Sequence, residues 1–178
     1  MTHGKRLARM IAPHVIDLSG SPMETYVNHA LTLPPRFGGL SMKSPLANKQ
    51  LVVEESKWRE LKHALLRPDM QWPDYNMLVE YLGDKEHAGK PARLDDKNRM
   101  QDYATAQYTA YPLMYDDVRN VAALDSTAQM LAGEFVRRGL SGELDRIRKL
   151  LRNEDFWLAI RCWFLRCCRL WLAMDRED

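Results

Sequence analysis

Residues 156–174 read FWLAIRCWFLRCCRLWLAM, and this stretch directs the interpretation of the whole chain. Every residue in it is apolar except three arginines. It contains three of the five tryptophans and all three cysteines, Cys162, Cys167 and Cys168. A run of this length and composition predicts a helix over about 154–173 that is apolar around most of its circumference.

The three arginines of this helix, Arg161, Arg166 and Arg169, fall on one side when successive residues are placed 100° apart. Arg148 and Arg152 join that side if the helix continues unbroken from the preceding segment. The opposite arc carries Trp157, Ile160, Trp163, Phe164, Cys167, Cys168, Trp171 and Met174. A membrane span is disfavoured, because each arginine near the centre of a bilayer costs about 2.5–3.5 kcal/mol on insertion scales.

Four interpretations of this helix remain, and the commonest is a core helix with a solvent-facing arginine stripe. A partner interface, including self-association, is the second, because interfaces favour Trp, Arg and Met. Contact between the arginines and nucleic-acid phosphates is the third, and binding at a membrane surface is the last. The side chains that would form a partner interface are Trp157, Trp163, Phe164 and Trp171.

The rest of the chain also reads as helical. Residues 21–24, Ser-Pro-Met-Glu, form a start signal, because Ser can cap a helix and Pro suits its first position. Capping residues, glycines and prolines bound the other segments. The expected helices cover about 22–31, 45–67, 74–82, 94–110, 118–138 and 141–152, followed by the helix at 154–173. Whether 141–174 forms one helix or two stays open.

The predicted fold is therefore mainly α, a compact bundle of about six helices. Residues 1–20 are expected to be an N-terminal arm, with one possible short strand at 14–18. Residues 21–178 are expected to form a single helical domain, with a loop at 33–43 and a flexible loop near 83–93. No segment alternates apolar and polar residues convincingly enough to predict a sheet.

Composition excludes several protein classes. The chain has 178 residues, of which 46% are hydrophobic and 28% charged, which is typical of a folded domain. No secretory signal is evident, because Pro13, His14 and Asp17 interrupt the apolar stretch near the N-terminus. Three cysteines, two of them adjacent, indicate reduced thiols and a cytoplasmic protein. No zinc spacing, glycine-rich phosphate loop or nucleophile motif is present, so we expect no metal and no cofactor.

Basic residues concentrate at the two ends of the chain, although the net charge is only +2. Arginine outnumbers lysine, and its guanidinium forms bidentate contacts with phosphate. A GC-rich genome would also explain the arginine bias. The residues expected to contact DNA or RNA are Lys5, Arg6, Arg9, Arg148, Arg152, Arg161, Arg166 and Arg169.

Two other groups of residues each have a functional and a structural interpretation. Tyr103, Tyr108, Tyr111 and Tyr115 form a stacking platform for bases or the rim of an amphipathic core helix, and the second is commoner. His63 near acidic residues, with the pairs 95–96 and 116–117 (both Asp-Asp), suggests a metal-binding or catalytic site. Paired acids at a helix start are more often caps.

We therefore expect a non-enzymatic helical accessory subunit that binds a nucleic-acid backbone, protein partners or both within a nucleoprotein assembly. The chain is similar in general character to the helical small subunits of CRISPR surveillance complexes, an analogy at the level of the fold. The alternative is a protein-binding adaptor or regulator that oligomerises through its Trp-rich C-terminal helix. The third hypothesis is an enzyme with an unrecognised site.

Overall fold

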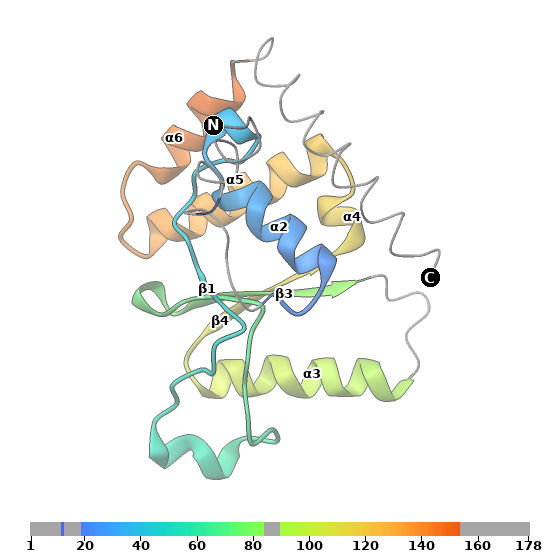
Figure 1. The fold of residues 1–178 in the computed structure, drawn as a ribbon. Helices are drawn as coiled ribbons and strands as arrows, with labels where there is room; N and C mark the ends of the chain where they lie inside the picture. Colours follow the sequence, from blue (N-terminus) through green and yellow to red (C-terminus); the bar gives the residue numbers. More distant parts are fainter. Residues whose placement is uncertain (1–11, 13–18, 84–89, 154–178) are drawn as a thin grey trace.

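The computed structural model describes residues 12, 19–83 and 90–153. This part of the chain contains both helices and strands, and its last three elements are helices (Figure 1). The α-helices are α2 (Pro22–Thr32), α3 (Lys90–Thr105), α4 (Tyr115–Val118), α5 (Val121–Arg137) and α6 (Glu143–Leu151). The strands are β1 (Leu46–Ala47), β2 (Met70–Trp72), β3 (Met77–Gly83) and β4 (Thr109–Met114). Short 3-10 helices are η2 (Pro35–Phe37), η3 (Glu55–Glu60) and η4 (Pro73–Tyr75).

The strands form one mixed sheet in the order β1-β2-β3-β4. β1, β2 and β3 are antiparallel neighbours, and the turn η4 closes the β2–β3 hairpin with Asn76 at a positive φ of 46°. β4 runs parallel to β3, so α3 serves as the crossover between them. A parallel pair needs such a connection, because the chain must return to the starting edge of the sheet.

Helices cover both faces of the sheet. In Figure 1, α3 lies below the sheet, while α2, α4, α5 and α6 lie above it. Phe135 of α5 packs edge-on against Trp72 and Tyr75, with ring centroids 5.2 Å apart in both pairs. On the other face, Leu78 packs with Tyr103 of α3 in a second, smaller core. The sheet is thus buried between two layers of helix.

The prediction of a mainly α bundle was wrong, since the structure contains a four-stranded sheet. The error is clearest at 77–82, which we expected to be helical and which forms β3. Met77, Leu78 and Val79 are all buried, because this central strand is covered on both faces. Such a strand loses the alternation of apolar and polar residues that distinguishes strands in a sequence. Because the predicted fold class was wrong, the analogy with the helical small subunits of CRISPR surveillance complexes is no longer supported.

Other boundaries also differ from the prediction. Residues 45–67 form β1 and η3 joined by extended chain, and no long helix. The helix expected over 94–110 ends at Thr105, and the chain then enters β4 with Pro112 inside the strand. β4 is the last strand of the sheet, where a residue without an N–H is tolerated. The helix expected over 118–138 is confirmed as α5, which begins three residues later than expected with Asn120 as its cap, and the short helix α4 precedes it.

The helix expected over 22–31 is confirmed as α2. Ser21 caps it as expected, since the Glu24 N–H donates to Ser21 Oγ at 3.2 Å. The Glu24 carboxylate accepts from the Gly20 N–H, one residue before the cap. The strand expected at 14–18, the helix at 154–173 and most of the arm at 1–20 lie outside the described residues. Within the described ranges, no helix is long and apolar enough to cross a bilayer.

Candidate functional site

A pair of carboxyl groups meets across the β2–β3 hairpin. Met70 pairs with Val79 in the sheet, so Asp69 and Glu80 are the next residues to face each other. The Asp69 N–H donates to Glu80 Oε2 at 3.4 Å, and the Tyr81 N–H donates to Asp69 Oδ2 at 2.7 Å. Glu80 is 2% exposed. We call Asp69 and Glu80 the carboxyl pair.

The carboxyl pair binds protons unusually tightly. Burial raises the pKa of Asp69 to about 8, and the negative charge of Glu80 adds to the rise. Burial also raises the pKa of Glu80, although hydrogen bonding by Tyr103 and the charge of Arg99 oppose it. Two carboxylates this close cannot both ionise cheaply in a low-dielectric interior. The pair therefore retains a proton at neutral pH.

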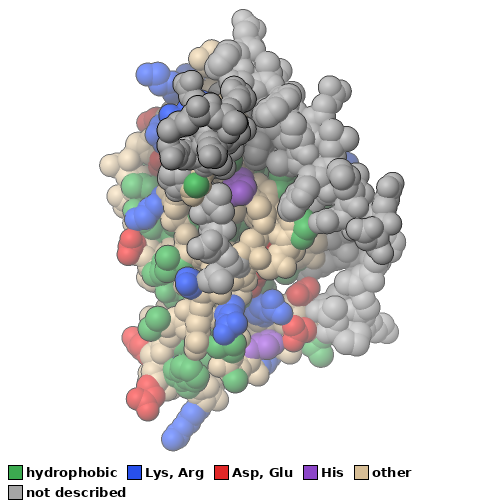
Figure 2. Space-filling model, viewed as in Figure 1, with side chains coloured by type: hydrophobic (Ala, Val, Ile, Leu, Met, Phe, Trp, Pro, Cys, Tyr) green, Lys and Arg blue, Asp and Glu red, His purple; other side chains and the backbone are tan. Residues whose placement is uncertain are grey.

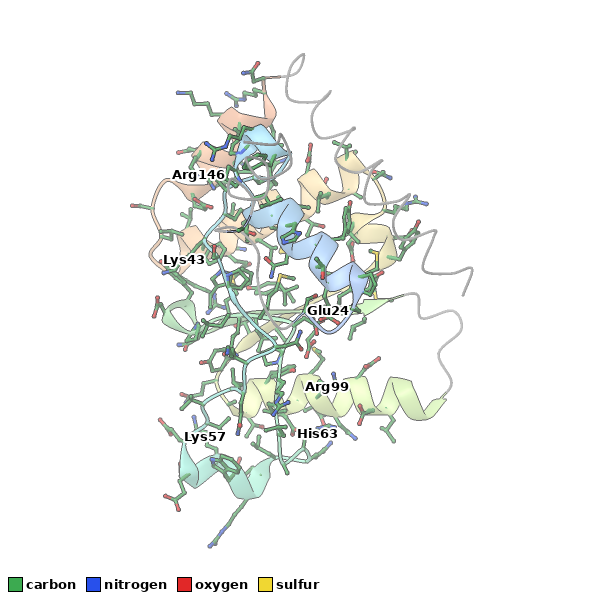
Figure 3. The ribbon with its side chains drawn as sticks, viewed as in Figure 1. Glu24, Lys43, Lys57, His63, Arg99 and Arg146 are labelled. Carbon is green, nitrogen blue, oxygen red and sulfur yellow. The ribbon has the colours of Figure 1, made fainter. Side chains whose placement is uncertain are left out.

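A third carboxylate approaches from α2. Glu24 Oε2 accepts hydrogen bonds from the Gly20 N–H at 2.7 Å and from Asn48 Nδ2 at 2.8 Å. Its charge also raises the pKa of Asp69, which places it within electrostatic reach of the carboxyl pair. Figure 3 shows Glu24 on α2, at the end of the helix that faces the sheet. Glu24 of α2 is thus coupled electrostatically to Asp69, which directly precedes β2.

Helix α3 supplies the groups that surround Glu80. The Tyr103 hydroxyl donates to Glu80 Oε1. One terminal nitrogen of Arg99 lies 4.0 Å from Glu80 Oε1, and the other donates to Asp95 Oδ2 at 3.1 Å. Asp95, Arg99 and Tyr103 are spaced four residues apart, so they follow one face of the helix.

His63 contacts Asp95 and so continues the series of charged side chains that begins with Glu80 and Arg99, on the side away from the sheet. Its Nδ1 lies 2.6 Å from Asp102 Oδ2, and its Nε2 lies 2.9 Å from Asp95 Oδ1. Hydrogen bonding with Asp95 and then Asp102 raises the pKa of His63, so the ring keeps its proton to higher pH than a free imidazole does. The side chains alternate in charge in the order Asp102, His63, Asp95, Arg99 and Glu80, and we call this set the charged row. In Figure 3, Arg99 lies between His63 and the sheet.

The structure describes only two of the eight expected phosphate-contact residues, Arg148 and Arg152. Both are exposed near the end of α6, beside exposed Lys149, and none of the three has an ion-pair partner among the described side chains. Figure 2 shows basic side chains where α6 lies, at the upper left. The other expected contacts lie outside the described residues: Lys5, Arg6, Arg9, Arg161, Arg166 and Arg169. The expected partner-interface residues Trp157, Trp163, Phe164 and Trp171 lie there too.

The tyrosines expected to form a stacking platform are not gathered together. Tyr103 is fully buried and Tyr108 packs beside it, whereas Tyr111 borders the core on the opposite face of the sheet. Tyr115 lies 41% exposed in α4. The structural interpretation of a core rim therefore fits this run better.

The acidic pairs have separate roles. Asp117 accepts from the Met114 N–H at 2.8 Å, as a cap would, and Asp116 pairs with Arg119 on the surface. Asp95 does contact His63, which the sequence had singled out. In the part of the chain that the structure describes, no group of three His, Cys, Asp or Glu side chains is arranged to hold a metal ion.

Sequence reasoning missed Asp69, Glu80, Glu24 as a site residue, and Arg99. One signal was available, because Glu80 is the sole charged residue in the apolar run 77–82. An isolated acid in a buried segment indicates either a specific partner or a function. No protein-family model, curated protein or solved structure matches this chain.

Proposed function

We propose that this chain hydrolyses phosphodiester bonds of a nucleic acid at the carboxyl pair, with a divalent cation such as Mg²⁺ or Mn²⁺. The observation that carries the proposal is the contact between Asp69, a partly buried acid directly before β2, and Glu80, a buried acid in β3. Such a pair is costly to keep in a fold, and strongly perturbed carboxyl groups concentrate at functional sites. This is a form of the third hypothesis from the sequence, an enzyme with an unrecognised site.

A divalent cation suits the electrostatics of the pair. A cation between Asp69 and Glu80 would replace the retained proton and offset the repulsion between the two carboxylates. Mg²⁺ commonly takes one or two protein carboxylates and completes its octahedral shell with water and substrate phosphate oxygens. Two carboxylates are therefore sufficient, and the negative charge of Glu24 would add to the attraction.

The chemistry is a displacement at phosphorus. When bound, the cation polarises the phosphate and lowers the pKa of the attacking water. The water oxygen forms a bond to phosphorus and one ester P–O bond breaks. The proton lost by the water passes to a carboxylate of the site, and the departing alkoxide takes a proton from solvent. A carboxylate within hydrogen-bond reach of the water is a suitable base.

A polyanionic substrate fits the surface charges. Arg148, Lys149 and Arg152 are exposed within two turns of α6 without ion pairs to described side chains. Cations of this kind bind phosphates electrostatically and without base reading. The same observation favours a second candidate, the accessory subunit expected from the sequence, which would bind the backbone and leave it intact.

The decisive experiment measures cleavage of end-labelled duplex DNA, single-stranded DNA and RNA with Mg²⁺, Mn²⁺ or EDTA. We expect cleavage that requires the cation and is abolished in Asp69→Asn and in Glu80→Gln. Asp116→Asn is the matched control, because Asp116 is an exposed acid paired with Arg119. Cleavage that persists in both site variants, or no cleavage of any substrate by the wild type, would overturn the proposal. Binding without cleavage would favour the second candidate.

A further inference from the structure

A cationic side chain aimed at the phosphate would accelerate phosphodiester hydrolysis beyond what the carboxyl pair and its cation supply. Negative charge develops on the phosphate oxygens in the transition state, and positioned arginines often stabilise it. Arg99 is the guanidinium that lies beside the pair, 4.0 Å from Glu80 Oε1. Its side chain is 37% exposed, so it is open to a ligand from solvent.

The charged row fixes where the Arg99 guanidinium lies. Asp95 Oδ2 accepts from one terminal nitrogen of Arg99, while Asp95 Oδ1 contacts His63 Nε2 at 2.9 Å. Both oxygens of Asp95 are therefore engaged. Asp102 anchors the other ring nitrogen of His63, and its side chain is only 2% exposed. An arginine held along one edge in this way keeps a defined direction for its remaining N–H groups.

We infer that Arg99 binds the non-bridging oxygens of the scissile phosphate and that Asp95 is its positioning residue. This inference rests on the proposed function, since it places the scissile phosphate next to Arg99 and the carboxyl pair. The planar fork of a guanidinium matches two phosphate oxygens, which an ammonium group cannot do. A purely structural Arg99 would neutralise Glu80 and contribute only to stability.

The test combines affinity with cleavage. The affinity probe is a short phosphorothioate DNA duplex, whose linkages resist hydrolysis, followed by fluorescence anisotropy in Mg²⁺. Cleavage of the ordinary duplex is followed under single-turnover conditions. Arg119→Ala and Asp116→Asn are the matched controls for Arg99→Ala and Asp95→Asn, because Arg119 and Asp116 form an exposed pair at 3.3 Å on another helix.

We expect Arg99→Ala to weaken duplex binding about 10-fold and to slow cleavage about 100-fold, the scale typical of one transition-state contact. Arg99→Lys should recover most of the affinity but little of the rate, a split that a structural role would not produce. Asp95→Asn should slow cleavage about 10-fold with a smaller effect on affinity. Both controls should stay within two-fold of the wild type.

Equal behaviour of Arg99→Ala and Arg119→Ala in affinity and cleavage would overturn the inference, and the proposed function would stand as long as the wild type cleaves. If the wild type does not cleave, the proposed function fails, and the affinity for the phosphorothioate duplex alone tests whether Arg99 contacts phosphate. A 10-fold loss confined to Arg99→Ala would then support the phosphate contact, and no loss would overturn it. If circular dichroism shows that Arg99→Ala does not fold, Arg99→Lys and Arg99→Gln replace it, and their affinity and cleavage rate are compared with the controls in the same way.

Discussion

His63 Nδ1 lies 2.6 Å from Asp102 Oδ2, and this contact fastens the segment after η3 to helix α3. The same carboxylate accepts the backbone N–H groups of Lys62 at 3.0 Å and of His63 at 2.9 Å. One buried side chain thus satisfies three donors from a segment about forty residues away in the sequence. Asp95 contacts the other ring nitrogen of His63. The packing of this segment on α3 is therefore connected, through Asp95, to the residues of the candidate site.

Removal of Asp102 should destabilise the protein strongly. Asp102→Ala leaves two backbone N–H groups and the His63 ring without their acceptor, which we expect to lower the free energy of unfolding by roughly 2–4 kcal/mol. Urea denaturation followed by circular dichroism measures the change. The control, Asp116→Ala, removes an exposed ion pair and should cost less than about 1 kcal/mol. Equal losses in the two variants would contradict the role of Asp102.

The His63 contacts should weaken as pH rises. The pKa of His63 is raised by hydrogen bonding with Asp95 and Asp102, so the folded protein binds this proton more tightly than the unfolded chain does. The resulting stability is fully present below about pH 6.5 and is lost as pH rises through the raised pKa. The difference in melting temperature between wild type and His63→Gln should therefore shrink from pH 6 to pH 8. A difference that stays constant or grows would show that His63 is not protonated in the folded state.

The carboxyl pair should limit stability at high pH. The pKa of Asp69 is about 8 in the folded protein, far above its ordinary value, so the stability it contributes is present at acidic pH and lost as pH rises towards 8. Asp69→Asn mimics the protonated acid at every pH. We expect it to be more stable than wild type by roughly 1–3 kcal/mol at pH 8 and nearly equal at pH 4. Asp116→Asn should show no such divergence, and a destabilised Asp69→Asn at pH 8 would refute the retained proton.

Helix α2 and its cap could be predicted from the sequence, because Ser21, Pro22 and Glu24 act locally. The sheet could not be predicted in this way. The first four residues of β3 are buried, so the strand shows no period of two, and its partner β2 is only three residues long. Tertiary burial on both faces removes the signal that reveals half-exposed strands.

The candidate site was predictable only in part. His63 and Asp95 stood out as chemically capable residues, but nothing in a single sequence placed them together. Once α3 is known, Asp95, Arg99 and Asp102 fall on one helix face through their spacing of four and seven residues. The carboxyl pair depends on the register of β2 against β3, which the turn at η4 sets. Glu80 was missed because the segment around it was interpreted as a helix.

The basic end of α6 should contribute to the salt dependence of nucleic-acid binding. The triple variant Arg148→Ala, Lys149→Ala, Arg152→Ala removes three exposed cations. Each lost phosphate contact should reduce the slope of log affinity against log salt by about 0.9 on duplex DNA. The matched control removes the same charge elsewhere: Arg36→Ala, Arg59→Ala and Arg119→Ala. Equal slopes for the two triple variants would place the phosphate-binding surface outside α6.

Cation binding to the carboxyl pair should release a proton. At pH 7 the pair retains a proton because burial and mutual repulsion raise the pKa of Asp69 to about 8, and a divalent cation must displace it. Calorimetric titration with Mn²⁺ in buffers of different ionisation enthalpy should show roughly one proton released per cation at pH 7. The affinity should increase towards pH 8, as the proton becomes easier to remove. Asp69→Asn should lose both the binding and the proton release, whereas Asp116→Asn should retain them. Binding that releases no proton, or that survives in Asp69→Asn, would place the cation at another site.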